Sequence, residues 1–123
     1  MTFELLCIIQ GAYFLATGIW PLISIDTFQK VTGPKTDLWL VRTVGILVGV
    51  VGAVLLGAGI RGRHTFEIAS LAVGCSAGLT LIDVVYVLNR TISRIYLVDA
   101  VAEVLLIVGW SLVVGGGQVS WEE

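Results

Sequence analysis

The chain has 123 residues, of which 57% are hydrophobic and 13% are charged, and its formal net charge is −2. Its mean hydropathy of +0.99 lies well above that of a soluble globular domain. The composition therefore excludes a soluble domain and indicates an all-α integral membrane protein.

Four apolar stretches reach or approach the roughly 20 residues that a helix needs to cross a ~30 Å hydrocarbon core. They cover residues 3–25, 38–60, 66–88 and 95–115. The first carries Glu4 where a signal peptide would be basic, and no A-x-A site follows, so we interpret it as a retained helix. Short connections leave no room for a soluble domain. We therefore predict one integral membrane domain, residues 1–123, built as a four-transmembrane-helix bundle.

Polar residues form stripes in three of these stretches, because residues three, four and seven apart share a helix face. The stripes are Gln10, Tyr13, Thr17 and Ser24; then Ser76, Thr80 and Asp83; then Tyr96, Asp99, Glu103 and Trp110. A lipid-facing surface does not favour such stripes. We expect all three to converge on the bundle interior.

Residues 31–37 predict a Gly-Pro break, with Thr36 or Asp37 as the N-cap of the next helix. That helix, residues 38–60, carries Arg42 and a dense series of glycines. The patterns G45-x-x-x-G49 and G74-x-x-x-G78 allow close approach of helix backbones. They fit packing within the bundle or self-association of copies.

The turn at residues 61–67 contains His64, the only histidine, which we expect to be solvated or interfacial, and Thr65, a candidate cap of the third apolar helix. Cys7 and Cys75 fall inside apolar stretches without metal-ligand or redox spacing, so we interpret them as small apolar fillers. We expect no metal, no cofactor and no nucleic-acid partner.

The basic residues are distributed unevenly. Lys30, Lys35, Arg42, Arg90 and Arg94 lie at the first and third connections, against Arg61 and Arg63 at the second. The positive-inside rule therefore places both termini outside the cytoplasm.

Comparing the chain with itself at an offset of 57 residues suggests an internal repeat. Asp26 then falls on Asp83, and Arg42 falls on Asp99. The repeat predicts two tandem parallel helical hairpins related by an axis along the membrane normal. Charges at equivalent depth could meet across that axis, so we expect Arg42 to pair with Asp99.

Among the polar residues, Glu103 is the hardest to explain by a purely structural role, because it lies near the middle of the last apolar stretch. We expect it to be protonated at neutral pH, since Asp99 competes with it for Arg42. A protonatable carboxyl group there suits proton-coupled transport, acid chemistry on a lipophilic substrate, or a ligand anchor. The alternative is a neutral side chain that bonds to Tyr13 or Thr80 and holds helices together.

The segment D37-L-W-L-V-R-T-V-G-I-L-V-G-V-V-G-A-V-L-L, in which Arg42 precedes Gly45 by three residues, resembles the small four-helix proteins grouped as DoxX-like. The resemblance implies a bacterial inner (plasma) membrane protein and makes Arg42 and Gly45 family positions. Members are mostly without assigned activity, and a few are linked to quinone-coupled sulfur oxidation as small subunits.

Together these patterns predict a polar, charge-paired site inside the bundle, formed by Arg42, Asp83, Asp99 and Glu103 with Tyr13 and Thr80 nearby. The favoured function is a binding or transport module, or a small subunit of a membrane complex. A membrane-embedded enzyme with Glu103 or Asp99 as catalytic proton donor is an alternative, and a homo-oligomeric channel is a second. The expected partners are the lipid bilayer, a lipophilic small molecule, and either further copies or a larger membrane complex.

Overall fold

A computed structural model describes residues 2–116 and 119–121, and that part of the chain is all-helical, without strands. The helices are α1 (Phe3–Ile23), α2 (Ile25–Thr32), α3 (Leu38–Arg61), α4 (Phe66–Leu88) and α5 (Tyr96–Gly115). All except α2 are long and apolar enough to cross a membrane. The four predicted helices are therefore confirmed, with ends that agree to within two residues.

The short helix α2 was not predicted, because the apolar pattern runs on to Ile25. Ser24 leaves helical geometry, with φ −147°, and its hydroxyl oxygen accepts a bond from the backbone N–H of Thr27 at 3.4 Å. Gly33 ends α2 at φ 101°, a left-handed conformation that glycine adopts easily. The chain therefore turns at Ser24, and Asp26 lies exposed on α2.

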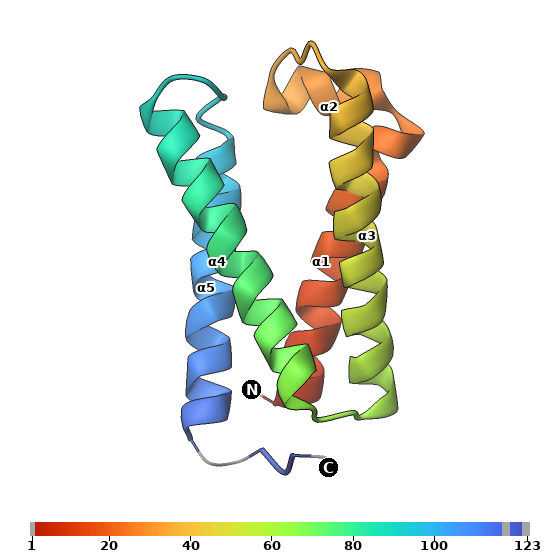
Figure 1. The fold of residues 1–123 in the computed structure, drawn as a ribbon, viewed down its shortest axis with the longest axis vertical. Coiled ribbons are helices and arrows are strands. Elements are labelled where there is room, and N and C mark those ends of the chain that lie inside the picture. The colour runs from red at the N-terminus through yellow and green to blue at the C-terminus, as the bar shows by residue number, and fades with distance from the viewer. Residues whose placement is uncertain (1, 117–118, 122–123) are drawn as a thin grey trace.

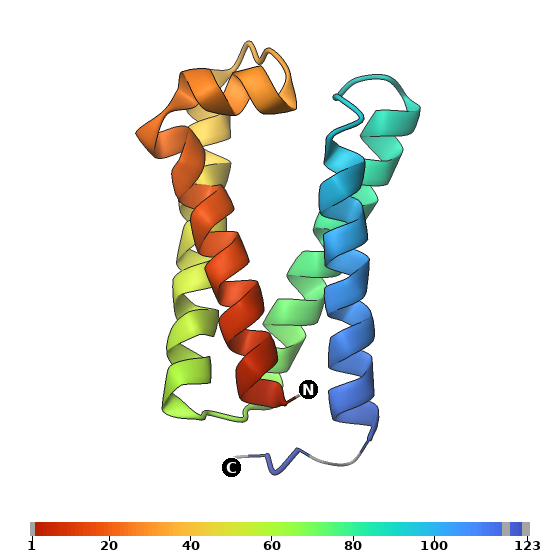
Figure 2. The same cartoon turned by 180° about the vertical axis from the view of Figure 1, so that it is seen from behind.

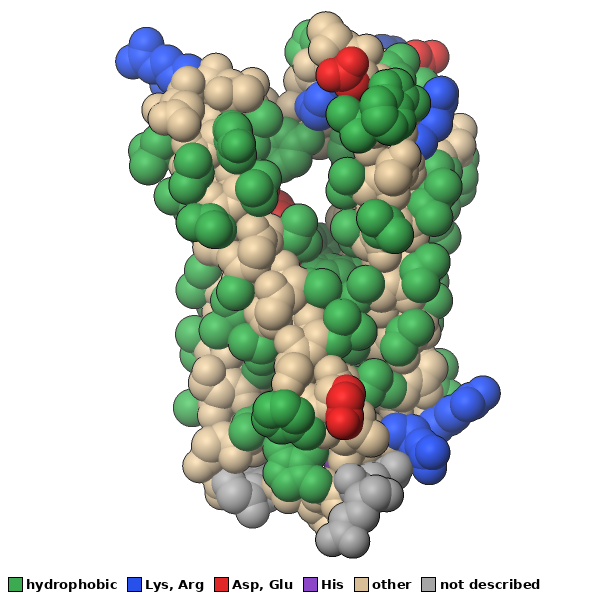
Figure 3. Space-filling view, viewed as in Figure 1, with side chains coloured by type: hydrophobic (Ala, Val, Ile, Leu, Met, Phe, Trp, Pro, Cys, Tyr) green, Lys and Arg blue, Asp and Glu red, His purple; other side chains and the backbone are tan. Residues whose placement is uncertain are grey.

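The four long helices form two antiparallel pairs, α1 with α3 and α4 with α5 (Figures 1 and 2). The pairs approach each other at the end that holds the N-terminus, which we call the closed end. They diverge toward the end that holds α2 and the α4–α5 connection, which we call the open end. The outer surface is largely apolar between the two ends, and the Lys and Arg side chains gather at the ends themselves (Figure 3). The architecture thus contains the two hairpins that the sequence predicts, while their origin by duplication stays a prediction.

Close glycine contacts hold α1 against α3. A Cβ atom on Gly18 would lie 2.5 Å from both the carbonyl oxygen of Gly45 and the backbone nitrogen of Gly49, so no larger residue fits without separating the helices. The G45-x-x-x-G49 pattern therefore serves packing within the chain. By contrast, a Cβ atom on Gly74 or Gly78 would meet open space.

The closed end is filled by an apolar core that joins the two pairs. Phe3 packs edge-on against Trp110 at a centroid distance of 5.0 Å, and Cys7 is fully buried beside them. His64, which was predicted to be solvated or interfacial, is half-buried: it contacts Glu4, and its ring lies tilted against that of Phe3 at a centroid distance of 4.7 Å. These contacts hold the two helix pairs together at the closed end, and the pairs diverge from there toward the open end.

The predicted cap of α4 is confirmed, since the hydroxyl oxygen of Thr65 accepts a bond from the backbone N–H of Ile68 at 3.2 Å. Asp37 occupies the N-cap position of α3, where its side chain makes no capping hydrogen bond.

Candidate functional site

A chain of buried hydrogen bonds crosses the middle of the molecule and joins α1 to the α4/α5 pair. The indole N–H of Trp110 donates to Oε1 of Gln10 at 2.7 Å, and Nε2 of Gln10 donates to Oγ of Ser76 at 3.1 Å and to the carbonyl oxygen of Ala72 at 2.9 Å. The Ser76 hydroxyl in turn donates to Oε1 of Glu103 at 3.1 Å. Gln10, Ser76, Glu103 and Trp110 are all fully buried. We call these four side chains the polar layer.

One carboxyl oxygen of the polar layer has no partner. Oε2 of Glu103 is buried without a hydrogen bond, and the same holds for Oδ2 of Asp83, whose residue is 4% exposed. Leaving a buried polar atom unpaired is costly, and most such atoms in folded proteins have partners. These two oxygens are therefore positions where a proton or a ligand group would be stabilised.

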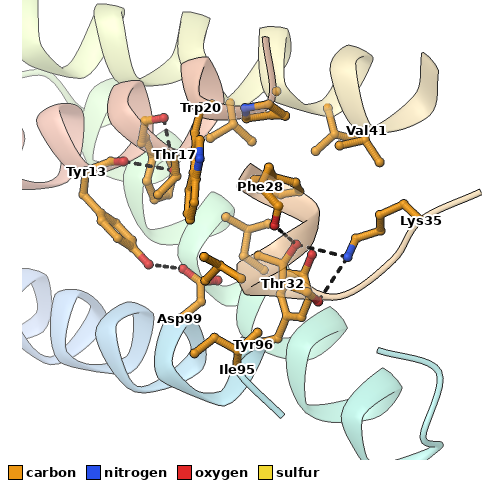
Figure 4. A pocket seen from close by; sticks show the side chains of 18 of the residues that line it. Tyr13, Thr17, Trp20, Phe28, Thr32, Lys35, Val41, Ile95, Tyr96 and Asp99 are labelled. Atoms are coloured by element: carbon orange, nitrogen blue, oxygen red, sulfur yellow. Dashed lines mark hydrogen bonds between the residues drawn. The ribbon is translucent and has the colours of Figure 1, made fainter. Parts of the chain in front are cut away.

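Asp99 lies one helical turn from Glu103, toward the open end, and links three helices. Its Oδ1 accepts a hydrogen bond from the hydroxyl group of Tyr13 on α1 (Figure 4). Its carboxyl group also interacts with that of Asp83 on α4. Two ionised carboxyl groups so close repel each other, and a positive charge between them would relieve the repulsion. Three acidic side chains therefore gather at this point of the molecule.

A cavity of about 560 Å³ extends from these carboxyl groups toward the open end, between the two helix pairs. Its walls come from all five helices and are mostly apolar, and Figure 3 shows the opening between the pairs. Asp99 and Glu103 are the acidic groups that line it. Representative wall residues are Thr17, Trp20, Phe28, Val41, Val44 and Leu79.

Lys35 lies at the mouth of the cavity, between the two pairs. Its ammonium group donates to both oxygens of Thr32, each at 3.2 Å, and to the carbonyl oxygen of Gly33 at 2.8 Å. It also lies 5.7 Å from the ring of Phe28 on α2 and 5.2 Å from the ring of Tyr96 on α5. Cations are attracted to aromatic faces at such distances. The one basic residue of the cavity lining is thus fully bonded within the protein.

The structure brings together most of the residues that the sequence singled out. Tyr13, Asp83, Asp99 and Glu103 meet between α1, α4 and α5. Thr80 is half-buried and donates to the carbonyl oxygen of Ser76 at 2.7 Å, so it does not bond to Glu103. The carboxyl group of Glu103 is bonded by Ser76 instead of the predicted Tyr13 or Thr80.

Arg42 lies elsewhere. It is exposed on α3 and does not line the cavity, and among the described residues no ion pair joins it to Asp99. The reason is helix adjacency: α3 packs mainly on α1, and α1 packs more closely than α3 against α5. Asp99 therefore meets Tyr13, and the predicted pairing with Arg42 is not formed.

Sequence reasoning placed Gln10, Ser76 and Trp110 in the polar stripes but did not assign them to the site. The available signal was their spacing, because each lies seven residues, or two helical turns, from Thr17, Asp83 and Glu103 respectively.

No family model, curated protein or solved structure matches this chain. Within residues 2–116 and 119–121, no group of His, Cys, Asp and Glu side chains is arranged to hold a metal ion. The resemblance of the Arg42 and Gly45 segment to DoxX-like proteins stays a prediction.

Proposed function

We propose that this protein is a binding and transport module of the membrane that takes a lipophilic small molecule into the cavity between its two helix pairs. The carrying observation is the cavity of about 560 Å³, which is lined by Glu103, a residue whose buried Oε2 has no hydrogen-bond partner. Pockets that enclose small molecules usually have volumes of roughly 300 to 1,000 Å³ and combine apolar walls with a few polar groups. The cavity has both properties.

The position of the cavity supports a lipophilic ligand. Its walls are formed by helices whose outer faces carry exposed apolar side chains, including Val50 on α3 and Val101 on α5. A molecule dissolved in the bilayer can therefore reach the open half without crossing a polar surface. The filled core of the closed end, with Trp110 and Phe3, blocks continuation of the cavity through the chain.

Native mass spectrometry on gently extracted protein tests this function. We expect wild-type chain to retain a lipophilic small molecule, and Val44→Trp, which fills the cavity from its α3 wall, to lose it. Val54→Trp is the matched control, because Val54 is exposed on the same helix outside the cavity.

Equal retention by Val44→Trp and wild type would contradict the proposed site. A fixed complex with other chains and no small molecule would support the subunit alternative. Chemical conversion of the bound molecule that Glu103→Gln abolishes would support the enzyme alternative.

A further inference from the structure

The inner end of the cavity holds acidic groups without a basic partner. Asp99 and Glu103 line it, and Asp83 lies directly behind Asp99. The basic residue of the lining, Lys35, stands at the mouth, where its three donors are used by Thr32 and Gly33. An entering molecule therefore passes the ammonium group of Lys35 at the mouth and meets carboxyl groups at the inner end, where the lining has no basic side chain.

The unpartnered oxygens give a second, independent indication of a ligand. Oε2 of Glu103 is fully buried, Oδ2 of Asp83 belongs to a residue 4% exposed, and neither receives a hydrogen bond. The three carboxyl groups receive two hydroxyl donors in all, one from Tyr13 to Asp99 and one from Ser76 to Glu103. Acceptor capacity thus exceeds donor capacity, and a buried acid in such a position is stabilised by a proton or by a cation.

Aromatic side chains in the walls favour a cation further. Trp20 and Phe28 pack edge to face at 5.3 Å in the lining, and Tyr96 completes the aromatic set from α5. The rings of Phe28 and Tyr96 already have the ammonium group of Lys35 over them. The cavity therefore combines apolar volume, aromatic faces and carboxyl groups, which together recognise a cation with an apolar body.

From this combination we infer that the ligand is a lipophilic cation, whose charged centre lies against Asp99 and Glu103 while its apolar body fills the cavity. The inference rests on the proposed function and specifies its ligand class. Ionised carboxyl groups would repel a lipophilic anion, whereas a cation supplies the positive charge that the inner end of the cavity lacks.

Such a cation and a proton would compete for the same carboxyl oxygens. The groups that face Glu103 and Asp99 from the other elements are Tyr13 on α1, Asp83 and Cys75 on α4, and, farther out, Lys35 before α3. The part of α3 in the lining is apolar or glycine. A proton bound to one of these carboxyl groups would have to leave when the cation takes its place.

Equilibrium binding to the full chain in nanodiscs tests the ligand class, with empty nanodiscs correcting for partition into lipid. The probes are tetraphenylphosphonium, a permanent cation, and triphenylphosphine oxide, a neutral molecule of similar shape. We expect saturable binding of the cation. Its affinity should be at least tenfold lower in Glu103→Gln, a change that keeps an oxygen to accept the hydrogen bond from Ser76. Asp99→Asn gives a second reading if Glu103→Gln does not fold. Glu67→Gln, exposed at the closed end, is the charge-matched control and should bind like wild type.

Saturable binding of the neutral probe at least as tight as that of the cation would overturn the cation inference and leave the proposed function standing. Cation binding unchanged in both Glu103→Gln and Asp99→Asn would also overturn it. Absence of saturable binding of either probe, in protein whose helical content is intact, would count against the inference and the proposed function together.

Discussion

The hydroxyl group of Tyr13 on α1 donates a hydrogen bond to Asp99 on α5, and so joins the two helix pairs at the inner end of the cavity. The contact places a neutral donor where the sequence favoured an arginine. Asp99 thereby stays next to the cavity, with Asp83 behind it, instead of being neutralised by an ion pair.

Removing this hydroxyl group should weaken the joint between the pairs. We expect Tyr13→Phe to lower the free energy of unfolding by about 1–3 kcal/mol, because a part-buried carboxyl oxygen loses its donor. Thermal unfolding in detergent measures the change. Tyr86→Phe, at an exposed position on α4, should stay within about 0.5 kcal/mol of wild type. Equal effects of the two variants would contradict the role of the contact.

Removing a hydroxyl group from the polar layer should lower the free energy of unfolding more than removing a serine hydroxyl group from the surface. Ser76→Ala removes both the donor to Glu103 and the acceptor for Gln10, so we expect a loss of about 1–3 kcal/mol. Ser111→Ala is the matched control, because Ser111 is exposed and bonds only to the carbonyl oxygen of Ile107 on its own helix. Chemical unfolding of both variants in mixed micelles checks the difference, and a cost at Ser111 equal to that at Ser76 would speak against the layer.

The two glycine series should respond oppositely to alanine. Gly18→Ala places a methyl group 2.5 Å from the α3 backbone, so we expect a destabilisation of about 1–3 kcal/mol from overpacking. Gly78→Ala meets open space and gains helix propensity, so its stability should equal or exceed that of wild type. Melting temperatures of the two variants in the same detergent test the contrast, which fails if Gly18→Ala is neutral.

Cation binding should weaken as the pH falls. Below the range in which the carboxyl groups ionise, protons occupy the oxygens that the cation needs, so the dissociation constant rises toward acidic pH. Titration with tetraphenylphosphonium in mildly alkaline and mildly acidic buffer measures the trend. Glu103→Gln should show a smaller pH dependence than wild type. An affinity that is independent of pH would argue against exchange of a proton for the cation.

The sequence was sufficient for the helices and for the inward faces, because a bilayer fixes how long an apolar helix must be and polar stripes have few other places to lie. Thus Tyr13, Asp99 and Glu103 could be placed in one interior before their contacts were known. Which helix contacts which was not predictable from hydropathy. The adjacency of α1 to both α3 and α5 decides that Asp99 meets Tyr13 and that Arg42 stays outside.

The comparison of the two halves of the chain shows a second limit of prediction from the sequence. It placed Asp26 on Asp83, yet Asp26 is exposed on α2 and Asp83 is buried on α4. The difference arises at Ser24, where a single side-chain cap starts a new helix across the open end. Local capping thus overrode a match between apolar patterns.

The confinement of the firm inter-pair contacts to the closed half has a mechanical consequence. The polar layer and the apolar core of the closed end hold the two helix pairs together, and the halves of the helices that enclose the cavity extend beyond these contacts. The half of a 20-residue helix beyond the polar layer is roughly 15 Å long, so a rotation of about 10° about that layer displaces its far end by about 3 Å. A small change in the angle between the pairs would therefore widen or narrow the mouth by a similar distance, while the packing around Trp110 stays intact.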